Sequence, residues 1–343
     1  MTIQWFPGHM AKTRRLIADN LGLVDVALEL LDARLPQSSR NPLLNELLGA
    51  KPRVLVLAKA DLAEEDRTKD WLAYFRRQGL GALACDLKGG NPKGEIKAIS
   101  EALRRQAEDI LSRRSRRGIT NKVIRAMVTG IPNAGKSTLI NLCAGGGRTA
   151  TADRPGVTKG KQWIRLGADL EMLDMPGILW PDLRDREGAR KLAVTGAIGD
   201  NAYDTEELAL WLIRWLRQNR PGRLASRYGV AEDDAGLVVD DAGQSDREAA
   251  GEKGGAGQRE RDDAEPAADG AGLAGERDDA EPATDDAGLA ENILALIGRR
   301  RGFLRKGGLV ETGKTAVMLL DELRGGKLGR VTWDDPAAAG GGP

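Results

Sequence analysis

The sequence predicts an α/β protein in which a parallel sheet flanked by helices is followed by an all-helical C-terminal domain. The chain has 343 residues, a length that suggests about two domains at roughly 150 residues each. Strand-like apolar runs alternate with helical patterns up to about residue 180, which is typical of a parallel sheet covered on both faces. Beyond that point only helical patterns continue, so the second domain is predicted to be all-helical.

The predicted strands are short runs rich in aliphatic residues. They lie at 24–33, 53–58, 81–85, 123–129 and 170–174. The first of them ends at Asp32, and the second is followed at once by Lys59-Ala-Asp61.

The predicted helices carry apolar residues at helical spacing. They lie at 10–22, 65–77, 96–112 and 136–144 in the first domain and at 205–218, 291–297 and 312–324 in the second. The arginine-rich stretch 113–117 is expected to be a polar connection between a helix and a strand.

The charge of the chain is unevenly distributed. Lys and Arg number 52 against 51 Asp and Glu, but residues 231–290 hold 19 acidic and 5 basic residues, so the remaining 283 residues carry a net charge of +15. Only five of the 60 residues in 231–290 are large and hydrophobic, which is too few to offset the entropy cost of ordering. We therefore predict an α/β domain at 1–180, a helical domain at 181–230 and 291–335, and a disordered acidic insertion at 231–290.

Several classes of protein are disfavoured by composition. Two cysteines, Cys85 and Cys143, are too few for a disulfide framework and indicate a reducing, cytoplasmic compartment. No apolar run reaches the roughly 18 residues of a membrane span, so no membrane is expected as a partner. The N-terminus has no apolar core typical of a signal peptide, and the single histidine, His9, excludes clusters of histidine ligands.

A glycine-rich loop follows the strand at 123–129 and precedes a helix. Its sequence, Gly130-Ile-Pro-Asn-Ala-Gly-Lys-Ser137, fits a phosphate-binding loop. In such a loop Lys136 reaches the β- and γ-phosphates, Ser137 binds Mg²⁺, and backbone N–H groups cradle the phosphates. The nucleotide is expected to lie on Asn133, Ala134, Gly135, Lys136, Ser137 and Thr138.

Two further segments supply candidates for the same site. Asp174 ends a buried strand 38 residues after Lys136, where its carboxylate suits a water-mediated Mg²⁺ contact, and Gly177 can bring its N–H to a γ-phosphate. Thr158, in Pro155-Gly-Val-Thr158, could supply a second hydroxyl to Mg²⁺ and sense the γ-phosphate. Each Pro-Gly stretch by itself is also compatible with an ordinary turn.

Lys59 and Asp61 match half of a guanine-reading Asn-Lys-x-Asp signature. A carboxylate at position 61 can accept hydrogen bonds from guanine N1–H and the 2-amino group, which adenine does not offer as a pair. Ala58 stands where the signature has asparagine. The alternative is an ordinary lysine and aspartate at a strand end.

The order of these motifs differs from that in ordinary GTPases, where the phosphate loop comes first and the guanine-reading signature lies near the end. The guanine-reading half precedes the phosphate loop, Thr158 and Asp174. Because such sites form at the carboxyl ends of parallel strands, relocating the chain termini leaves the site intact. A circular permutation of a phosphate-loop GTPase domain accounts for this order.

These residues resemble the circularly permuted GTPases of ribosome assembly. The motifs that carry the resemblance are Trp5-Phe-Pro-Gly-His-Met10, Asp32-Ala-Arg-Leu-Pro36 with Ser39-Arg-Asn-Pro42, Asp174-Met-Pro-Gly-Ile-Leu-Trp-Pro181 and Lys327-Leu-Gly-Arg330. The resemblance spans nearly the whole chain outside 231–290. It implies hydrolysis of GTP, with Mg²⁺, coupled to late assembly of the large ribosomal subunit, whose precursor and rRNA would be the partners of a chain that is monomeric when free.

The resemblance also assigns roles to particular residues. A hydrophobic residue, here Ile178, replaces the glutamine that orients water in ordinary GTPases, and His9 is the family's candidate for that task. A surface histidine packed on Trp5 or Phe6 is the alternative. Asn133 resembles the asparagine of potassium-dependent GTPases, so K⁺ is a further candidate cofactor; a loop asparagine that caps its own backbone is the alternative.

Base specificity departs from the family pattern. Ala58 lacks the amide that would support the base site, a loss of about 1–3 kcal/mol if a buried partner goes unpaired. The motif that should contact guanine O6 is blurred, and 84–88 is the nearest stretch. Two other functions therefore stay open: a nucleotide-gated rRNA-binding assembly factor with little turnover, and an NTPase with relaxed base preference.

Basic clusters outside the insertion suggest contacts with rRNA phosphates. They comprise Lys12, Arg14 and Arg15, the arginines of 113–117, and Arg299, Arg300, Arg301, Arg305 and Lys306. A solvated basic face is the alternative for any single cluster.

Overall fold

The computed structural model describes residues 8–145, 162–179, 185–230 and 284–339. A six-stranded sheet with the order β3-β2-β1-β4-β6-β5 forms its centre. The strands are β1 Val26–Asp32, β2 Arg53–Ala58, β3 Gly81–Cys85, β4 Ile124–Gly130, β5 Gln162–Leu166 and β6 Leu170–Asp174. The five predicted strands are therefore present, and all five run parallel.

The sixth strand, β5, was not predicted. It pairs antiparallel with β6 at the edge of the sheet. The two strands form a hairpin whose turn contains Gly167 with a φ of +69°, a conformation that glycine adopts without strain. The sheet is therefore mixed, with one antiparallel edge strand.

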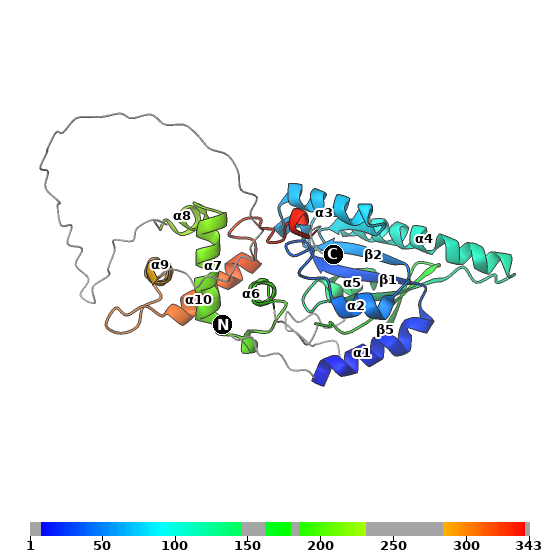
Figure 1. The fold of residues 1–343 in the computed structure, drawn as a ribbon, viewed down its shortest axis with the longest axis horizontal. Coiled ribbons are helices and arrows are strands. Elements are labelled where there is room, and N and C mark those ends of the chain that lie inside the picture. The colour runs from blue at the N-terminus through cyan, green and yellow to red at the C-terminus, as the bar shows by residue number, and fades with distance from the viewer. Residues whose placement is uncertain (1–7, 146–161, 180–184, 231–283, 340–343) are drawn as a thin grey trace, which may run out of the picture.

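Helices cover both faces of the sheet (Figure 1). They are α1 Gly8–Asn20, α2 Pro42–Leu48, α3 Glu65–Arg77, α4 Pro92–Arg116 and α5 Lys136–Cys143, with short 3-10 turns at Leu21–Leu23 and Ala60–Leu62. Successive side chains of β1 point to opposite faces of the sheet. Leu28 packs in the cluster that includes α4 and α5, whereas Ala27 packs with α1 and α2. Every residue of β1 is buried, as expected of a strand covered on both sides.

Two local expectations for this domain need correction. The seven-residue helix α2 was not predicted; it begins at Pro42, and Asn41 caps it by accepting a hydrogen bond from the N–H of Leu43. The basic stretch 113–117 is not a connection, because α4 continues through Arg116.

The helical part consists of α6 Arg186–Val194, α7 Thr205–Asn219, α8 Arg223–Tyr228, α9 Thr284–Arg300 and α10 Thr312–Arg324, with a 3-10 turn at Asp200–Ala202. In Figure 1, α6 lies between the sheet and the helices α7, α9 and α10. Of these helices, α6 and α8 were not predicted. The helix α9 begins at Thr284 and buries Ala290. The expected insertion was therefore placed too far along the chain at its C-terminal end, residue 290. Its remaining residues, 231–283, lie outside the described part.

The chain returns to the α/β domain after α10. The N–H of Val331 donates to the carbonyl of Leu62 at 3.0 Å, and that of Trp333 donates to the carbonyl of Arg34 at 2.9 Å. The short helix α11 Pro336–Ala339 follows, and the Tyr74 hydroxyl of α3 donates to the carbonyl of Ala339 at 3.1 Å. Residues 331–335, expected in the helical domain, therefore also contact the α/β domain, while the ring of Trp333 packs on Trp215 of α7.

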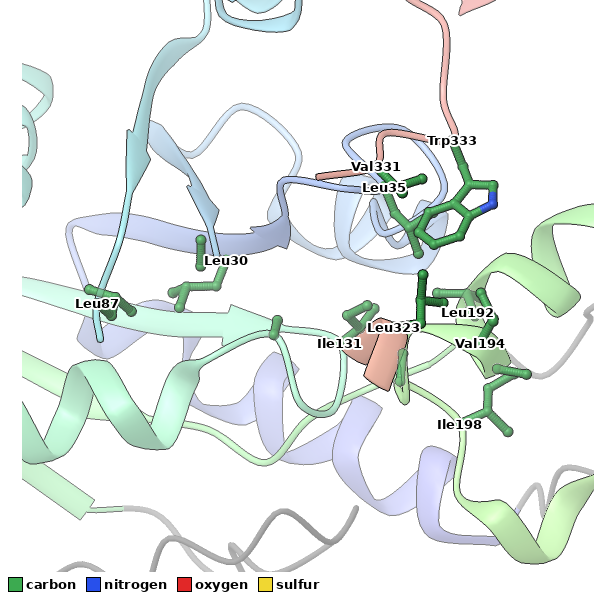
Figure 2. Packing of buried hydrophobic residues seen from close by; sticks show 14 of the residues in the cluster. Leu30, Leu35, Leu87, Ile131, Leu192, Val194, Ile198, Leu323, Val331 and Trp333 are labelled. Carbon is green, nitrogen blue, oxygen red and sulfur yellow. The ribbon is translucent and has the colours of Figure 1, made fainter. Parts of the chain in front are cut away.

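One hydrophobic core joins the two parts. Figure 2 shows Ile131 of the glycine-rich loop, Leu192 of α6 and Leu323 of α10 together in one cluster, with Trp333 above them. The glycine-rich loop and the helical domain therefore share buried side chains, so a displacement of one changes the packing of the other.

Candidate functional site

The carboxyl ends of the parallel strands meet at one edge of the sheet. Strand register aligns Leu30 with Gly130, Val128 with Asp174 and Ala58 with Cys85. The phosphate loop (residues 130–137), Asp174 and Lys59 therefore emerge at the same edge, which is where α/β sheets bind ligands.

The phosphate loop wraps around its own lysine. The Lys136 ammonium donates to the carbonyls of Gly130, at 3.1 Å, and Ile131. Lys136 is also the first residue of α5, so Ser137 and Thr138 lie in the first turn of that helix. The predicted strand–loop–helix context of Lys136, Ser137 and Thr138 is present, and the helix N-terminus favours bound anions.

Gly177 lies against this loop. A Cβ added at Gly177 would be 3.0 Å from the Lys136 ammonium nitrogen and 3.0 Å from backbone atoms of Pro132. Any side chain at position 177 would displace the lysine or the loop, which explains the requirement for glycine there. The structure therefore brings together two segments that the sequence connected only by spacing.

Asp174 and Lys136 form an electrostatic pair at this edge. Burial raises the pKa of Asp174 to about 6, with Lys136 opposing the shift. Burial lowers the pKa of Lys136 to about 8, where Asp174 opposes and Lys59 adds to the shift. Burial thus disfavours the charged forms of both groups, and a bound cation next to Asp174 and phosphates next to Lys136 would offset this cost.

The carboxylate of Asp174 fits a magnesium site. Within the described residues, its Oδ1 is buried and has no hydrogen-bond partner, and a buried acceptor of this kind calls for a cation, water or donor. Carboxylate and hydroxyl oxygens are the ligands that Mg²⁺ prefers, usually with several retained waters. Asp174, through water, and Ser137 would hold the ion, which supplies positive charge next to the phosphates.

The base-reading candidates stand beside the phosphate loop. A Cβ added at Gly135 would lie 3.6 Å from the Cβ of Ala58, so the end of β2 lies next to the loop. Asp61 is exposed in the 3-10 turn after β2. Partial burial and the neighbouring carboxylate of Asp86 raise the pKa of Asp61. The Cδ1 of Leu87 would lie 3.6 Å from a Cβ at Gly135, so the segment 84–88 also lies next to the phosphate loop.

Lys59 is held by a residue that the sequence did not single out as part of the site. Its ammonium donates to Oδ2 of Asp32 at 2.9 Å, and Arg34 binds the same carboxylate at 2.9 and 2.7 Å. Burial would raise the pKa of Asp32, but Arg34 and Lys59 outweigh it and hold that pKa below its usual range. Burial lowers the pKa of Lys59, and Asp32 opposes the shift. In the sequence, the signal that could have identified Asp32 is a carboxylate at the end of a buried strand.

Asn133 makes a long-range contact. It has a left-handed backbone with a φ of +56°, and its Nδ2 donates at 2.7 Å to the carbonyl of Gly196, 63 positions later. The side chain is therefore directed by the turn after α6, and the contact with K⁺ stays a prediction.

The structure describes the three residues considered for contacts with Mg²⁺ or the attacking water to different extents. Thr158 lies outside the described residues. His9 belongs to α1, but its side chain is not among those described. Ile178 is only 1 % exposed and packs with Ile17 and Leu44, so position 178 cannot contact an attacking water.

Among the described residues, no helix is long and apolar enough to cross a membrane.

Comparison with known proteins identifies the family and the fold of the chain. The family described as 50S ribosome-binding GTPase matches residues 125–225, which begin at the strand before the phosphate loop. Two solved structures of YlqF, one bound to GDP and one from T. maritima bound to GNP, superpose with a TM-score of 0.56 each. They are 21 and 22 % identical and cover 94 and 95 % of this chain and 100 and 98 % of their own, which shows a common fold.

Closer relatives match along the whole sequence. Ribosome biogenesis GTPase A of Bacillus cereus is 38 % identical, with 99 % of this chain and 96 % of the relative covered. Ribosome biogenesis GTPase A of Priestia megaterium is 39 % identical, with 99 % of each covered. Since the phosphate loop, Asp174 and Gly177 also meet at one edge of the sheet, the chain belongs to the ribosome biogenesis GTPase A family and is a GTP hydrolase.

Proposed function

We propose that this GTPase binds the precursor of the large ribosomal subunit and its rRNA, and couples GTP hydrolysis to a late step of assembly. The observation that carries the proposal is the shared core between the phosphate loop and the basic helical domain, in which Ile131 and Leu323 belong to one cluster (Figure 2). A particle that docks on the helical domain can therefore act on the nucleotide site.

The basic surface of the helical domain supports an RNA partner. Arg299 and Arg300 end α9, and the loop that follows carries Arg305, which is 70 % exposed. Exposed cations of this kind neutralise phosphates and give salt-dependent binding. The relatives whose names refer to ribosome biogenesis and to the 50S ribosome are consistent with such a partner.

In the proposed mechanism water attacks the γ-phosphorus of GTP, the bond from that phosphorus to the β–γ bridging oxygen breaks, and GDP leaves while the water loses a proton to give inorganic phosphate. Lys136 stabilises negative charge on the β- and γ-phosphates, the N–H of Gly177 binds the γ-phosphate, and Thr158 contributes a second hydroxyl. Ser137, Thr158 and, through water, Asp174 would hold Mg²⁺, which would supply positive charge next to the phosphates.

Water orientation is assigned to His9. Ile178 is buried beneath α1 and α2 and cannot take this role, and His9 is the only histidine of the chain. We propose that His9 reaches the water once the particle docks. K⁺ near Asn133 would add a second cation at the phosphates.

The two cysteines, Cys85 and Cys143, are free and buried, which is consistent with the reducing, cytoplasmic setting that we propose. We also propose that the free protein is monomeric.

The test is GTP hydrolysis and co-sedimentation with large-subunit precursor particles, with small-subunit particles as the control. Binding in the GTP state and stimulated turnover with the large-subunit precursor only are the expected results. Equal binding to both particles would reject the partner.

A second candidate is a nucleotide-gated rRNA-binding factor with little turnover or relaxed base specificity. The buried Ala58 favours it, because no amide supports the base site. Competition among GTP, ATP and XTP, together with multiple-turnover kinetics, separates the two; equal competition by ATP would favour this second candidate.

A further inference from the structure

The C-terminal turn of α6, residues 193–196, receives side-chain hydrogen bonds on four consecutive carbonyls. Arg324 of α10 supplies two of them, since its Nη2 donates to Ala193 at 3.1 Å and its Nε donates to Val194 at 3.2 Å. The helical domain is thus hydrogen-bonded to residues 193 and 194 of the turn through one guanidinium.

Residues of the nucleotide site donate hydrogen bonds to the other two carbonyls of the turn, at 195 and 196. Nη2 of Arg34, whose guanidinium also binds Asp32 next to Lys59, donates to the carbonyl of Thr195 at 3.3 Å. Nδ2 of Asn133 in the phosphate loop donates to the carbonyl of Gly196 at 2.7 Å. Arg34, next to the base-reading Lys59, and Asn133, in the phosphate loop, therefore donate to two adjacent residues of the same turn.

This turn has a fixed shape. The N–H of Ala197 bonds to Leu192 at 2.9 Å and that of Gly196 to Ala193 at 3.0 Å, while Gly196 has a φ of +80°. These are the bonds and the left-handed residue of a Schellman motif. Because the motif locks the backbone, a force on one carbonyl moves its neighbours with it.

Arg324 is itself anchored and suits its acceptors. Its guanidinium also donates to Asp200 at 3.2 Å and to the Tyr203 hydroxyl at 2.7 Å. Its positive charge lies at the negative end of the α6 dipole, and a planar guanidinium can serve several acceptors at once.

We propose that Arg324 is a positioning residue for GTP hydrolysis, acting through the α6 turn on Asn133. Arg324 fixes the turn, the carbonyl of Gly196 directs the Asn133 amide, and Asn133 sets the phosphate loop around the reacting phosphates. A shift of α10 is thereby transmitted to the loop. This role concerns the GTPase activity itself and is independent of which particle docks.

The test uses full-length R324Q, N133A and the double variant, with steady-state kinetics of GTP hydrolysis and thermal unfolding. We expect R324Q to lower kcat by about tenfold, within the range of typical coupling between sites, with a smaller change in KM. The double variant should be no slower than the slower single variant, because both substitutions interrupt one route.

R227Q is the matched control. Arg227 binds Glu322 of the same helix α10 at 2.8 and 2.7 Å, so its loss perturbs α10 without removing a donor to the α6 turn. R227Q should lower the unfolding temperature and leave kcat unchanged. An unchanged kcat in R324Q, multiplicative effects in the double variant, or the same loss of kcat in R227Q would each overturn the proposal.

Discussion

The side-chain amide of Asn41 donates at 3.0 Å to the carbonyl oxygen of Ile178. The N–H of Ile178 donates in turn to the carbonyl of Gly130 at 3.2 Å. The backbone directly after Gly177 is thus held between the N-cap of α2 and the first residue of the phosphate loop. Asn41 has two tasks, because its Oδ1 also accepts from the N–H of Leu43 at 2.9 Å.

The substitution N41D separates these tasks. Aspartate keeps the capping acceptor but places a second acceptor against the Ile178 carbonyl. Because Asn41 is fully buried, we expect a loss of about 1–3 kcal/mol in the free energy of unfolding. Turnover should fall further than nucleotide affinity, because the segment after Gly177 is released.

Denaturant unfolding, kcat and nucleotide Kd are the measurements. N91D is the control, since Asn91 caps α4 through its Oδ1 at an exposed position. If N41D behaves like N91D in all three measurements, the hydrogen bond to Ile178 does not hold the segment.

Nucleotide binding should be strongest between about pH 6 and pH 8. Asp174 must be ionised to attract Mg²⁺, and burial raises its pKa to about 6, so Mg²⁺ affinity falls as the pH drops through that value. Lys136 must be charged to hold phosphates, and burial lowers its pKa to about 8, so nucleotide affinity falls as the pH rises through that value. Titrations of a fluorescent nucleotide and of Mg²⁺ from pH 5 to pH 9 measure both limbs.

D174N identifies the acidic limb. The variant should bind Mg²⁺ weakly at every pH and lose the change near pH 6. An acidic limb in D174N identical to that of the wild type would assign the titration to another group.

Asp32 should contribute much more to stability than an exposed ion pair. It is buried between Lys59 and Arg34, and removing one partner of a buried pair costs about 3–5 kcal/mol. D32N should therefore lose about that much in denaturant unfolding and bind GDP more weakly. K69Q removes the exposed pair with Glu65, whose side chains are 64 and 67 % exposed, and should cost under about 1 kcal/mol. Equal costs would show that Asp32 is not an organising carboxylate.

A58N should restore guanine discrimination. Ala58 is buried, and its Cβ would lie 3.6 Å from a Cβ at Gly135, so an amide at position 58 would lie next to the phosphate loop, where we expect it to support the base. We expect GTP to gain about 1–3 kcal/mol in binding free energy relative to ATP. Competition binding measures this difference, with A58S as a control whose hydroxyl is too short to bridge both. An unchanged preference in A58N would mean that the base site is completed by other residues.

Much of the fold could be predicted because the signals were local. The helix Glu65–Arg77 has the bounds that its amphipathic pattern indicated. The glycine-rich loop has its expected strand and helix on either side, since both have apolar runs of ordinary length.

The elements that were missed are short or depend on distant partners. The helix α2 has only seven residues and is defined by its Asn41 cap and by packing on Ile17 and Met127. Thr284–Ala290 looked like the Ala- and Gly-rich insertion, but it is the first part of α9, and Asp286 pairs there with Arg217 of α7. The roles of Asp32, Arg34 and Asn133 likewise arise from contacts that composition and spacing do not encode.

We propose that docking of the large-subunit precursor activates hydrolysis through His9. The direct measurement is single-turnover GTP hydrolysis by wild type and H9A, each with and without the precursor particle. We predict that the particle accelerates the wild type, that H9A binds GTP with unchanged affinity, and that H9A gains no acceleration. Equal acceleration of H9A and wild type would show that His9 does not orient the attacking water.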